Sequence, residues 1–258
     1  MQRRPAARRG RAVWRGLLRR LNAALRAGAL QSVCELNGAA MVKGRMIHQQ
    51  VLVGPHALSG ELILPAQAIG VVLFAHGSGS SRLSPRNRYV AESLHGRRLG
   101  TLLFDLLSEA EGHDGANVFD IGLLSQRLLQ AMAWVRERAE LRALRLGLFG
   151  ASTGAAAALV AAAERPQNVA AVVSRGGRPD LAGAALPQVR APTLLLVGGF
   201  DAEVLALNRE ALRELTCEKR LEVVPRATHL FEEAGALQRV AHSAGDWFVA
   251  HLAPGAAK

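Results

Sequence analysis

Apolar and polar residues alternate in blocks from residue 46 onward, and the blocks predict strands and helices in turn. Apolar runs typical of strands fall at 51–53, 61–64, 70–75, 101–106, 144–149, 169–174, 191–197 and 221–224. Predicted helices fall at 85–98, 120–140, 155–163, 202–215 and 232–252. We therefore expect an α/β fold, a doubly wound and mostly parallel sheet with helices on both faces.

Some boundaries within this pattern carry more specific expectations. Gly100 is expected to end the helix that begins at Pro85, and Trp134 to belong to the core rather than to a ligand site. The segment 107–118 is the longest connection, and it is polar and acidic. A loop of this kind at the carboxyl end of a strand is a candidate rim or lid of a binding site.

Charge divides the chain into two parts. Residues 1–45 contain 11 of the 32 lysines and arginines and one of the 21 acidic residues, so the net charge of +11 belongs almost entirely to this leader. Residues 46–258 are nearly neutral and are expected to form one domain. Only 4% of the chain is aromatic, so we expect this domain to bind no nucleic acid.

The leader has the pattern of a basic amphipathic helix over residues 11–30. It could lie on an anionic membrane, serve as a transit peptide, or be a dispensable extension upstream of a start at Met41 or Met46. We favour the extension, or a mobile tail, because runs of charge are usually solvated. Membrane contact is expected only if the leader is present and functional.

Cysteine usage and hydropathy bear on location. Cys34 and Cys217 show neither metal-ligand spacing nor a framework of pairs. A reducing compartment is the natural expectation, so we predict a cytoplasmic protein. No run approaches the roughly 18 apolar residues that a membrane span needs. We expect neither a cofactor nor a metal.

The motif Gly150-Ala151-Ser152-Thr153-Gly154 stands between the apolar run 144–149 and the alanine-rich segment 155–163. A G-x-S-x-G motif between a buried strand and a helix is a nucleophile elbow, whose sharp turn exposes the serine Oγ above the sheet. The flanking glycines fit such a turn because a Cβ would strike the strand or the helix beside it. Ser152 is therefore a candidate nucleophile.

A serine needs a base, and the base needs an acid that holds it in one tautomer. Ser152, Asp201 and His229 each follow a predicted strand, in the chain order nucleophile, acid, base that α/β-hydrolases use. A serine or aspartate in such a place is often only a helix cap, and a lone histidine is often structural. Asp180 is the rival acid, but Asp201 directly follows the strand 191–197 and is preferred.

Two N–H donors must face the charge that develops on the carbonyl oxygen. We expect one from the backbone of Thr153, at the start of the elbow helix, and one from Ser78 in the loop His76-Gly77-Ser78-Gly79-Ser80-Ser81. The alternative for this loop is a phosphate cradle. It lacks the lysine of a P-loop and the spacing of a dinucleotide fingerprint, which argues against a nucleotide site.

Four arginines, namely Arg82, Arg86, Arg175 and Arg178, fall near the predicted mouth of the site. Guanidinium groups suit a carboxylate or phosphate on a substrate. The alternative is that they pair with Asp105, with Asp180 or with the acidic loop 109–114. The sequence leaves both possibilities open.

Four segments together carry a family resemblance. They are His76-Gly-Ser-Gly-Ser-Ser-Arg-Leu-Ser-Pro-Arg-Asn87, Phe149-Gly-Ala-Ser-Thr-Gly-Ala-Ala-Ala157, Ser174-Arg-Gly-Gly-Arg-Pro-Asp-Leu181 and Thr228-His-Leu-Phe-Glu-Glu233. They closely resemble the dienelactone-hydrolase-like branch of the α/β-hydrolases, in particular the group associated with phosphoribosyltransferase domains. The resemblance covers essentially residues 46–252 and none of the leader. It implies the α/β-hydrolase fold with little or no cap, and the triad Ser152, Asp201 and His229.

Two departures qualify the resemblance. Dienelactone hydrolases proper carry a cysteine nucleophile where this chain has Ser152, which favours ordinary ester hydrolysis. Arg226 stands where the group usually has glycine. We expect a serine esterase that cleaves small carboxylic esters or lactones through an acyl-enzyme. The alternative is a hydrolase-fold partner of a phosphoribosyltransferase with weak or vestigial activity.

Overall fold

The computed structural model describes residues 46–255, within a compact unit that spans Gly44–Lys258. The leader, the helix expected at 11–30 and Cys34 lie outside the described residues. The strands are β1 (Ile47–Val53), β2 (Leu58–Leu64), β3 (Gly70–Ala75), β4 (Leu99–Phe104), β5 (Arg145–Ala151), β6 (Ala171–Arg175), β7 (Thr193–Gly198) and β8 (Lys219–Val224). The helices are α2 (Pro85–His95), α3 (Glu109–Gly112), α4 (Gly115–Phe119), α5 (Ile121–Glu137), α6 (Thr153–Glu164), the 3₁₀ segment η1 (Pro179–Gln188), α7 (Ala202–Glu214) and α8 (Ala236–Leu252).

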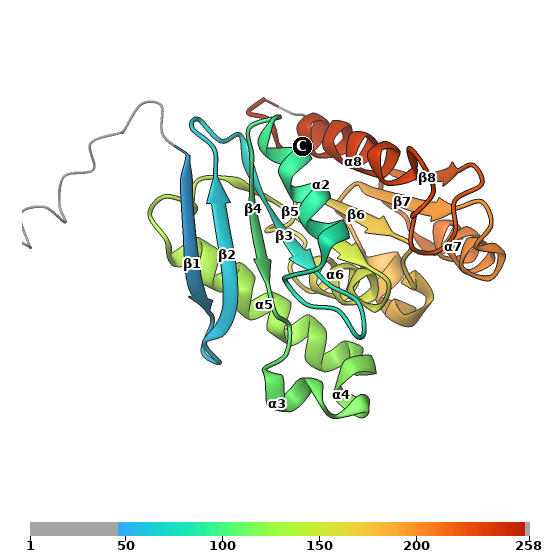
Figure 1. Cartoon of the computed structure of the whole chain (residues 1–258), viewed down its shortest axis with the longest axis horizontal. Helices are drawn as coiled ribbons and strands as arrows, with labels where there is room; N and C mark the ends of the chain where they lie inside the picture. Colours follow the sequence, from blue (N-terminus) through green and yellow to red (C-terminus); the bar gives the residue numbers. More distant parts are fainter. Residues whose placement is uncertain (1–45, 256–258) are drawn as a thin grey trace, which may run out of the picture. The chain divides into compact units, whose positions relative to one another are not determined.

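The eight strands form one sheet in the order β1-β2-β4-β3-β5-β6-β7-β8, as Figure 1 shows. The hairpin β1–β2 is antiparallel and joins β4 in antiparallel register, and all pairs from β4 to β8 are parallel. Parallel neighbours need crossover connections, which the helices between them supply. The predicted fold class is confirmed.

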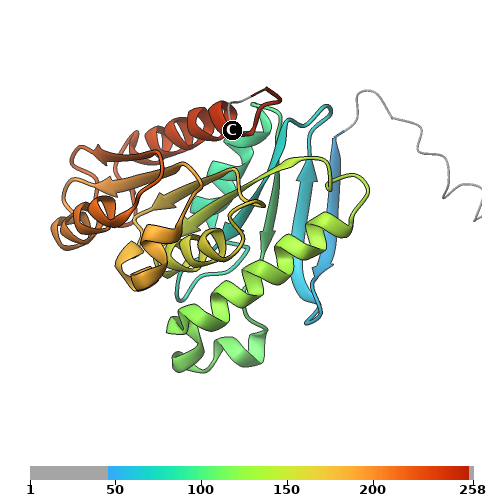
Figure 2. The same ribbon diagram turned by 180° about the vertical axis from the view of Figure 1, so that it is seen from behind.

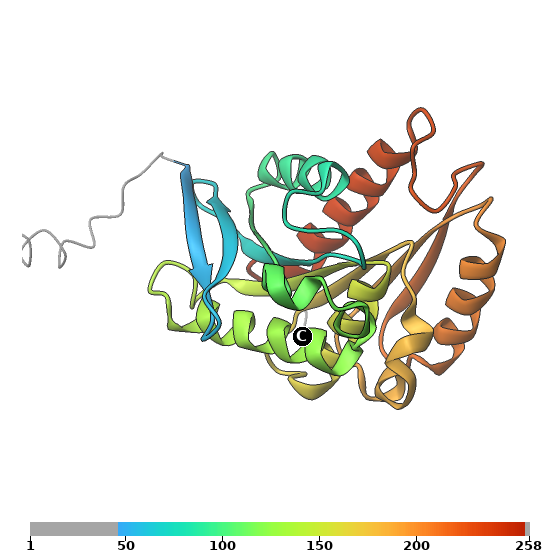
Figure 3. The same ribbon diagram turned by 60° about the horizontal axis from the view of Figure 1, so that its bottom comes forward.

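Helices cover both faces of the sheet, and each face has its own core. Along β3, Val71 and Leu73 belong to the cluster that packs with α5 and α6, whereas Val72 and Phe74 belong to the cluster with α2 and α8. Figure 2 shows α5 running across the first face, and Figure 3 shows α2 and α8 on the opposite side of the sheet. Each of the strands β3, β4 and β7 has six residues, and all of them are buried, as expected of strands covered on both faces.

The structure differs from the expected boundaries at three places. Helix α2 ends at His95 with Gly96 as its cap, and Gly100 lies inside β4. A Cβ on Gly100 would lie 2.7 Å from Leu64 Cδ1, so the glycine permits close packing of strands rather than ending a helix. The connection 107–118 contains the short helices α3 and α4, and η1 was not predicted. Trp134 is half-buried on α5, with the Arg138 guanidinium 3.9 Å from its ring centroid.

Candidate active site

Ser152 stands at the turn between β5 and α6, with φ 51° and ψ −123°. This left-handed conformation is strained for a residue with a side chain. A Cβ on Gly150 would lie 2.4 Å from Ala155 Cα, and one on Gly154 would lie 2.2 Å from the Ala75 carbonyl oxygen. Both flanking positions therefore exclude any side chain. The Ser152 side chain makes no capping hydrogen bond to α6, which argues against a purely capping role.

Asp201 and His229 come together from the loops that follow β7 and β8. His229 Nδ1 and Asp201 Oδ2 are 2.7 Å apart. Asp201 holds the N-cap position of α7 but its side chain makes no capping hydrogen bond, so the carboxylate is committed to the histidine. Its side chain is 14% exposed against 40% for that of His229. His229 Nε2 makes no hydrogen bond to any of residues 46–255.

Close backbone packing fixes the two loops against each other. The Phe200 N–H donates to the Ala227 carbonyl at 2.9 Å. A Cβ on Gly198 would lie 2.3 Å from the same carbonyl oxygen, so only glycine allows this approach. The rival acid Asp180 instead accepts hydrogen bonds from Arg178, with Nε–Oδ1 at 2.9 Å and Nη2–Oδ2 at 2.7 Å.

The ends of β5 and β6 bring Ser152 toward the histidine loop. The Ser152 N–H donates to the Arg175 carbonyl at 3.3 Å, and the Arg178 N–H donates to the Ser152 carbonyl at 3.1 Å. Gly176, between these two arginines, has φ 50°, and a Cβ there would lie 3.6 Å from His229 Cε1. The three residues expected to form a triad thus lie on adjoining loops at the carboxyl edge of the sheet.

The loop that carries His229 contains two left-handed residues without being glycine-rich. Arg226 has φ 59° and Phe231 has φ 56°. The positive φ of Arg226 explains why glycine would suit this position, because glycine adopts a positive φ without steric cost. The loop is closed by the Thr228 N–H, which donates to Glu233 Oε1 at 3.0 Å. Hydrogen bonds from Thr228 and from the Glu233 backbone lower the pKa of the Glu233 carboxyl.

His76 ties the loop after β3 to the end of β4. Its Nδ1 is 3.0 Å from the Gly77 carbonyl oxygen, and its Nε2 accepts the Leu106 N–H at 3.0 Å. The ring must therefore be neutral with its proton on Nδ1. Burial lowers the pKa of His76, against the opposing influence of the Gly77 carbonyl and the Asp105 charge. Sequence reasoning placed His76 at a strand end but missed this role, which depends on where β4 ends.

The expected oxyanion donors lie against each other. A Cβ on Gly77 would lie 2.8 Å from Ser152 Cβ, so the loop after β3 passes directly over the elbow. The Ser78 N–H donates to Thr153 Oγ1 at 3.0 Å. Thr153 is the first residue of α6, where backbone N–H groups have no partner within the helix. The part played by the Thr153 side chain was not anticipated from the sequence.

Three of the four candidate arginines have carboxylate partners. Arg82 forms an ion pair with Asp105, and its N–H donates to Asp105 Oδ1 at 2.8 Å. Arg86 lies 3.4 Å from Glu232, and Arg178 is bound to Asp180 as described above. These ion pairs favour the structural alternative for Arg82, Arg86 and Arg178.

Arg175 is different, because none of residues 46–255 offers it a carboxylate. The residue is 8% exposed. Its Nη2 donates to Asn87 Oδ1 at 3.4 Å, and its buried Nε has no hydrogen-bond partner. Burial and the nearby charge of Arg86 lower the pKa of Arg175 to about 10. The guanidinium of Arg175 is therefore buried, charged at neutral pH and bonded to a single acceptor. Arg175 lies at the end of β6, and its carbonyl accepts the Ser152 N–H.

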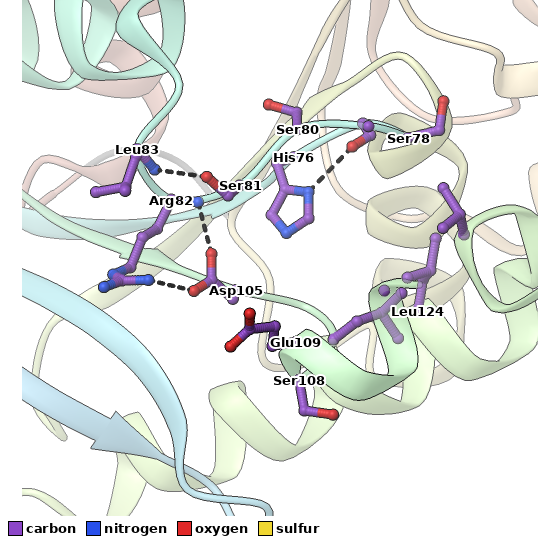
Figure 4. Close-up of a pocket in the computed structure, with 15 residues that line it drawn as sticks. His76, Ser78, Ser80, Ser81, Arg82, Leu83, Asp105, Ser108, Glu109 and Leu124 are labelled. Atoms are coloured by element: carbon purple, nitrogen blue, oxygen red, sulfur yellow. Dashed lines mark hydrogen bonds and ion pairs between the residues drawn. The ribbon is translucent and has the colours of Figure 1, made fainter. Parts of the chain in front are cut away.

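A cavity of about 560 Å³ lies between the loop after β3 and the connection 107–118 (Figure 4). Its polar wall includes His76, Ser78 and the Arg82–Asp105 pair. Its apolar lining consists of Leu83, Leu107, Val118 and Leu124. Gly77 lines the cavity and also packs against Ser152, but Ser152 itself is not among the lining residues.

The connection 107–118 forms one wall of this cavity and is held in place by a contact with α5. Glu111 closes a capping box with Ser108 at the start of α3. Its Oε1 also lies 2.6 Å from Nη2 of Arg127, a largely buried residue of α5. Hydrogen bonds from Ser108 and the Arg127 charge lower the pKa of Glu111. The predicted rim is therefore an ordered element held to α5 by an ion pair.

Residues 46–255 contain no group of three or more His, Cys, Asp or Glu side chains that could hold a metal ion. Within the same described range, no helix is long and apolar enough to cross a membrane.

The sheet order and the loops gathered at its carboxyl edge define an α/β-hydrolase. The sequence matches the model of the Dienelactone hydrolase family over residues 118–249. The crystal structure of a dienelactone hydrolase from Anabaena variabilis is 55% identical, with 81% of this chain and 99% of that chain covered and a TM-score of 0.77. The chain belongs to the dienelactone hydrolase family, which confirms the resemblance seen in the sequence.

More distant solved structures share the fold alone. Est1E from Butyrivibrio proteoclasticus, solved with ferulic acid, is 13% identical, with 79% of this chain and 99% of that chain covered and a TM-score of 0.65. A dienelactone hydrolase-like promiscuous phosphotriesterase from metagenomic libraries is 17% identical, with 81% and 100% covered and a TM-score of 0.66.

A curated relative differs in length. A Mycobacterium tuberculosis protein provisionally named a phosphoribosyl transferase is 57% identical over 203 residues, which are 79% of this chain and 46% of that protein. This chain therefore spans less than half the length of the curated relatives that it matches.

Proposed function

We propose that this α/β-type hydrolase cleaves small carboxylic esters or lactones through an acyl-enzyme on Ser152. The observation that carries the proposal is the 2.7 Å contact between His229 Nδ1 and Asp201 Oδ2 on loops beside a strained, uncapped Ser152. An imidazole held by a carboxylate through Nδ1 keeps Nε2 available to accept a proton from a serine. The uncapped Ser152 hydroxyl and the free Nε2 support this use.

In the proposed reaction, Ser152 Oγ attacks the ester carbonyl carbon while His229 Nε2 accepts its proton. Asp201 orients the imidazole and stabilises the imidazolium that forms. The negative charge on the carbonyl oxygen is held by the Thr153 N–H and by the loop that contains Ser78. His229 then gives the proton to the departing alkoxide, and a water molecule activated by the same histidine hydrolyses the acyl-enzyme. The nucleophile, base and acid are all side chains, so the reaction requires no cofactor.

Arg175 supports a preference for substrates with an anionic group. Its guanidinium lacks a carboxylate partner among the described residues, whereas Arg82, Arg86 and Arg178 already have one. A charged hydrogen bond to substrate contributes about 1.5–3 kcal/mol, or roughly 10- to 100-fold in affinity. Arg175→Met should raise the KM of a carboxylate-bearing ester by that factor and leave the KM of its neutral methyl ester nearly unchanged. Equal changes in the KM of both esters would show that Arg175 does not bind the anionic group of the substrate.

The experiment that tests the proposed function compares the wild type with Ser152→Ala on p-nitrophenyl acetate. Turnover should fall by about 10⁴-fold or more, as when the nucleophile of a triad is removed. Circular dichroism should show an unchanged fold, because Ser152 makes no capping bond whose loss would affect α6. Wild-type turnover in the variant would contradict the assignment.

A second candidate function rests on the length of the relatives. The chain covers 46% of the Mycobacterium tuberculosis protein named for phosphoribosyl transfer, so this domain has a larger context there. The alternative is that the domain associates with a phosphoribosyltransferase and has weak or vestigial activity. Binding to a purified phosphoribosyltransferase domain, together with no measurable ester turnover, would favour this alternative.

A cytoplasmic location of the protein remains a prediction.

A further inference from the structure

The hydroxyl group of Thr153 accepts a hydrogen bond from one of the two backbone donors expected to face the oxyanion. Thr153 is 3% exposed, and its Oγ1 accepts the Ser78 N–H at 3.0 Å. Because of this hydrogen bond, the Ser78 N–H points at the threonine and is not free to reach a substrate oxygen. One of the two expected donors is therefore already in use.

A threonine hydroxyl accepts hydrogen bonds through its lone pairs and also has one hydrogen to donate. The acceptor side of Thr153 Oγ1 is used by Ser78. Its hydrogen is donated to none of residues 46–255, and at 3% exposure the group has little access to water. A buried donor without an acceptor is costly unless a bound molecule supplies one.

The position of this hydroxyl makes the substrate oxygen the natural acceptor. Thr153 directly follows Ser152, and its own N–H is unpartnered at the start of α6. The loop after β3 passes over the elbow, since a Cβ on Gly77 would lie 3.6 Å from Ser152 Oγ. An oxygen atom that accepts the Thr153 N–H beside Ser152 is therefore close to the hydroxyl of the same residue.

We propose that Thr153 stabilises the oxyanion with its side chain as well as its backbone, and that the Ser78 N–H acts through it. The chain of hydrogen bonds runs from the Ser78 N–H to Thr153 Oγ1, and from the Thr153 hydroxyl to the substrate oxygen. Donation by Ser78 polarises the hydroxyl and strengthens its own hydrogen bond, as in other buried networks. No bond to hydrogen breaks in this role, so the proton balance of the reaction is unchanged. The inference rests on the proposed ester hydrolysis at Ser152.

A different use of the same contact makes the opposite prediction. The hydroxyl could merely shield the Ser78 N–H in the free enzyme and rotate away when substrate binds, so that Ser78 donates directly. Removal of the hydroxyl would then leave Ser78 free from the start. In that case, turnover would stay the same or rise.

The test replaces Thr153 with valine, which keeps the shape and removes the hydroxyl, and with serine, which keeps the hydroxyl. Thr193→Val is the matched control, because Thr193 is also fully buried but lies at the start of β7 and donates to the Ala191 carbonyl. Turnover of p-nitrophenyl acetate and binding of a trifluoromethyl ketone, which forms an oxyanion on the serine, are measured for each. Circular dichroism monitors folding, and Thr153→Ala provides a second variant without the hydroxyl.

We expect Thr153→Val to lower kcat by about 10- to 100-fold, somewhat less than loss of a full oxyanion donor because Ser78 is released. KM should change by less than about threefold, and ketone affinity should fall by the same factor as kcat. Thr153→Ser should restore most of the activity, and Thr193→Val should change neither quantity. Wild-type or higher kcat in Thr153→Val and Thr153→Ala would overturn the inference. Ser152→Ala separates this result from failure of the proposed function, since its inactivity would still support the esterase.

Discussion

Two histidines follow strands at the same edge of the sheet, and the structure gives them opposite surroundings. His229 is 40% exposed at its side chain and is bonded through Nδ1 to the Asp201 carboxylate. His76 is buried, and its two ring nitrogens contact the Gly77 carbonyl and the Leu106 N–H. His229 has a free Nε2 while its Nδ1 is bonded to a carboxylate, and this arrangement suits proton transfer. His76 is fixed as a neutral ring and suits the positioning of a loop.

The comparison shows that partners, rather than residue type or strand position, decide what a histidine can do. A carboxylate partner stabilises the imidazolium, so His229 can gain a proton during the proposed reaction. Protonation of His76 at Nε2 would instead remove the acceptor for Leu106 and leave a buried N–H group without a partner. The two hydrogen bonds by which His76 joins the loop after β3 to the end of β4 therefore require a neutral ring.

The largest effect should come from separating His229 from its carboxylate. Asp201→Asn should lower kcat/KM for p-nitrophenyl acetate by about 10⁴-fold, because the amide favours the wrong tautomer of the imidazole. Asp180→Asn is the matched control, since Asp180 pairs with Arg178 and not with the histidine. Its activity should stay within a few-fold of the wild type. Equal losses in the two variants would show that His229 is not supported by Asp201.

A smaller effect should appear in the stability of His76 variants and its dependence on pH. Burial lowers the pKa of His76 in the folded protein, so the unfolded chain, with a histidine pKa of about 6.5, takes up the proton first as pH falls. The free energy of unfolding should therefore be steady above about pH 7 and decline below about pH 6.5.

Urea unfolding at several pH values checks this expectation. His76→Gln should be less stable than the wild type by about 1–3 kcal/mol at neutral pH, because hydrogen bonds to Gly77 and Leu106 are lost. Its stability should decline less steeply at acid pH. Some decline should remain, because burial also lowers the pKa of His95 and His251. A variant with the full wild-type slope would mean that His76 does not titrate with unfolding.

The smallest effect concerns the loop that carries His229. Arg226 adopts φ 59°, a conformation that costs a residue with a side chain about 1 kcal/mol or more. Arg226→Gly should remove this strain and raise the free energy of unfolding by up to about 1 kcal/mol, partly offset by the greater entropy of glycine in the unfolded chain. Thermal unfolding measures the change, with Arg226→Ala as the control that keeps a Cβ and gains nothing. A less stable glycine variant would show that the arginine side chain compensates for the strain.

The fold and the proposed triad were accessible from sequence because each depends on a local pattern. Periodicity located the strands, and the strand-end rule then selected Ser152, Asp201 and His229. Gly100 was misjudged because its reason is a contact with Leu64, a residue of another strand. The bonds of His76 and the hydroxyl of Thr153 depend on how the loop after β3 meets β4 and α6. Arg178 pairs with its near neighbour Asp180, but the partners of Arg82 and Arg86 come from distant segments, so residue spacing could not choose between substrate and ion pair for these two.

The most direct test of the account is covalent labelling with a fluorophosphonate probe, followed by mass spectrometry of the peptides. The probe reacts with a serine only when a base activates it. We predict one adduct, on the peptide that contains Ser152, and at least a hundredfold slower labelling in His229→Gln, since general-base catalysis contributes about 10²–10⁴-fold. No adduct at Ser152, or equal labelling rates with and without His229, would contradict the proposed serine hydrolase.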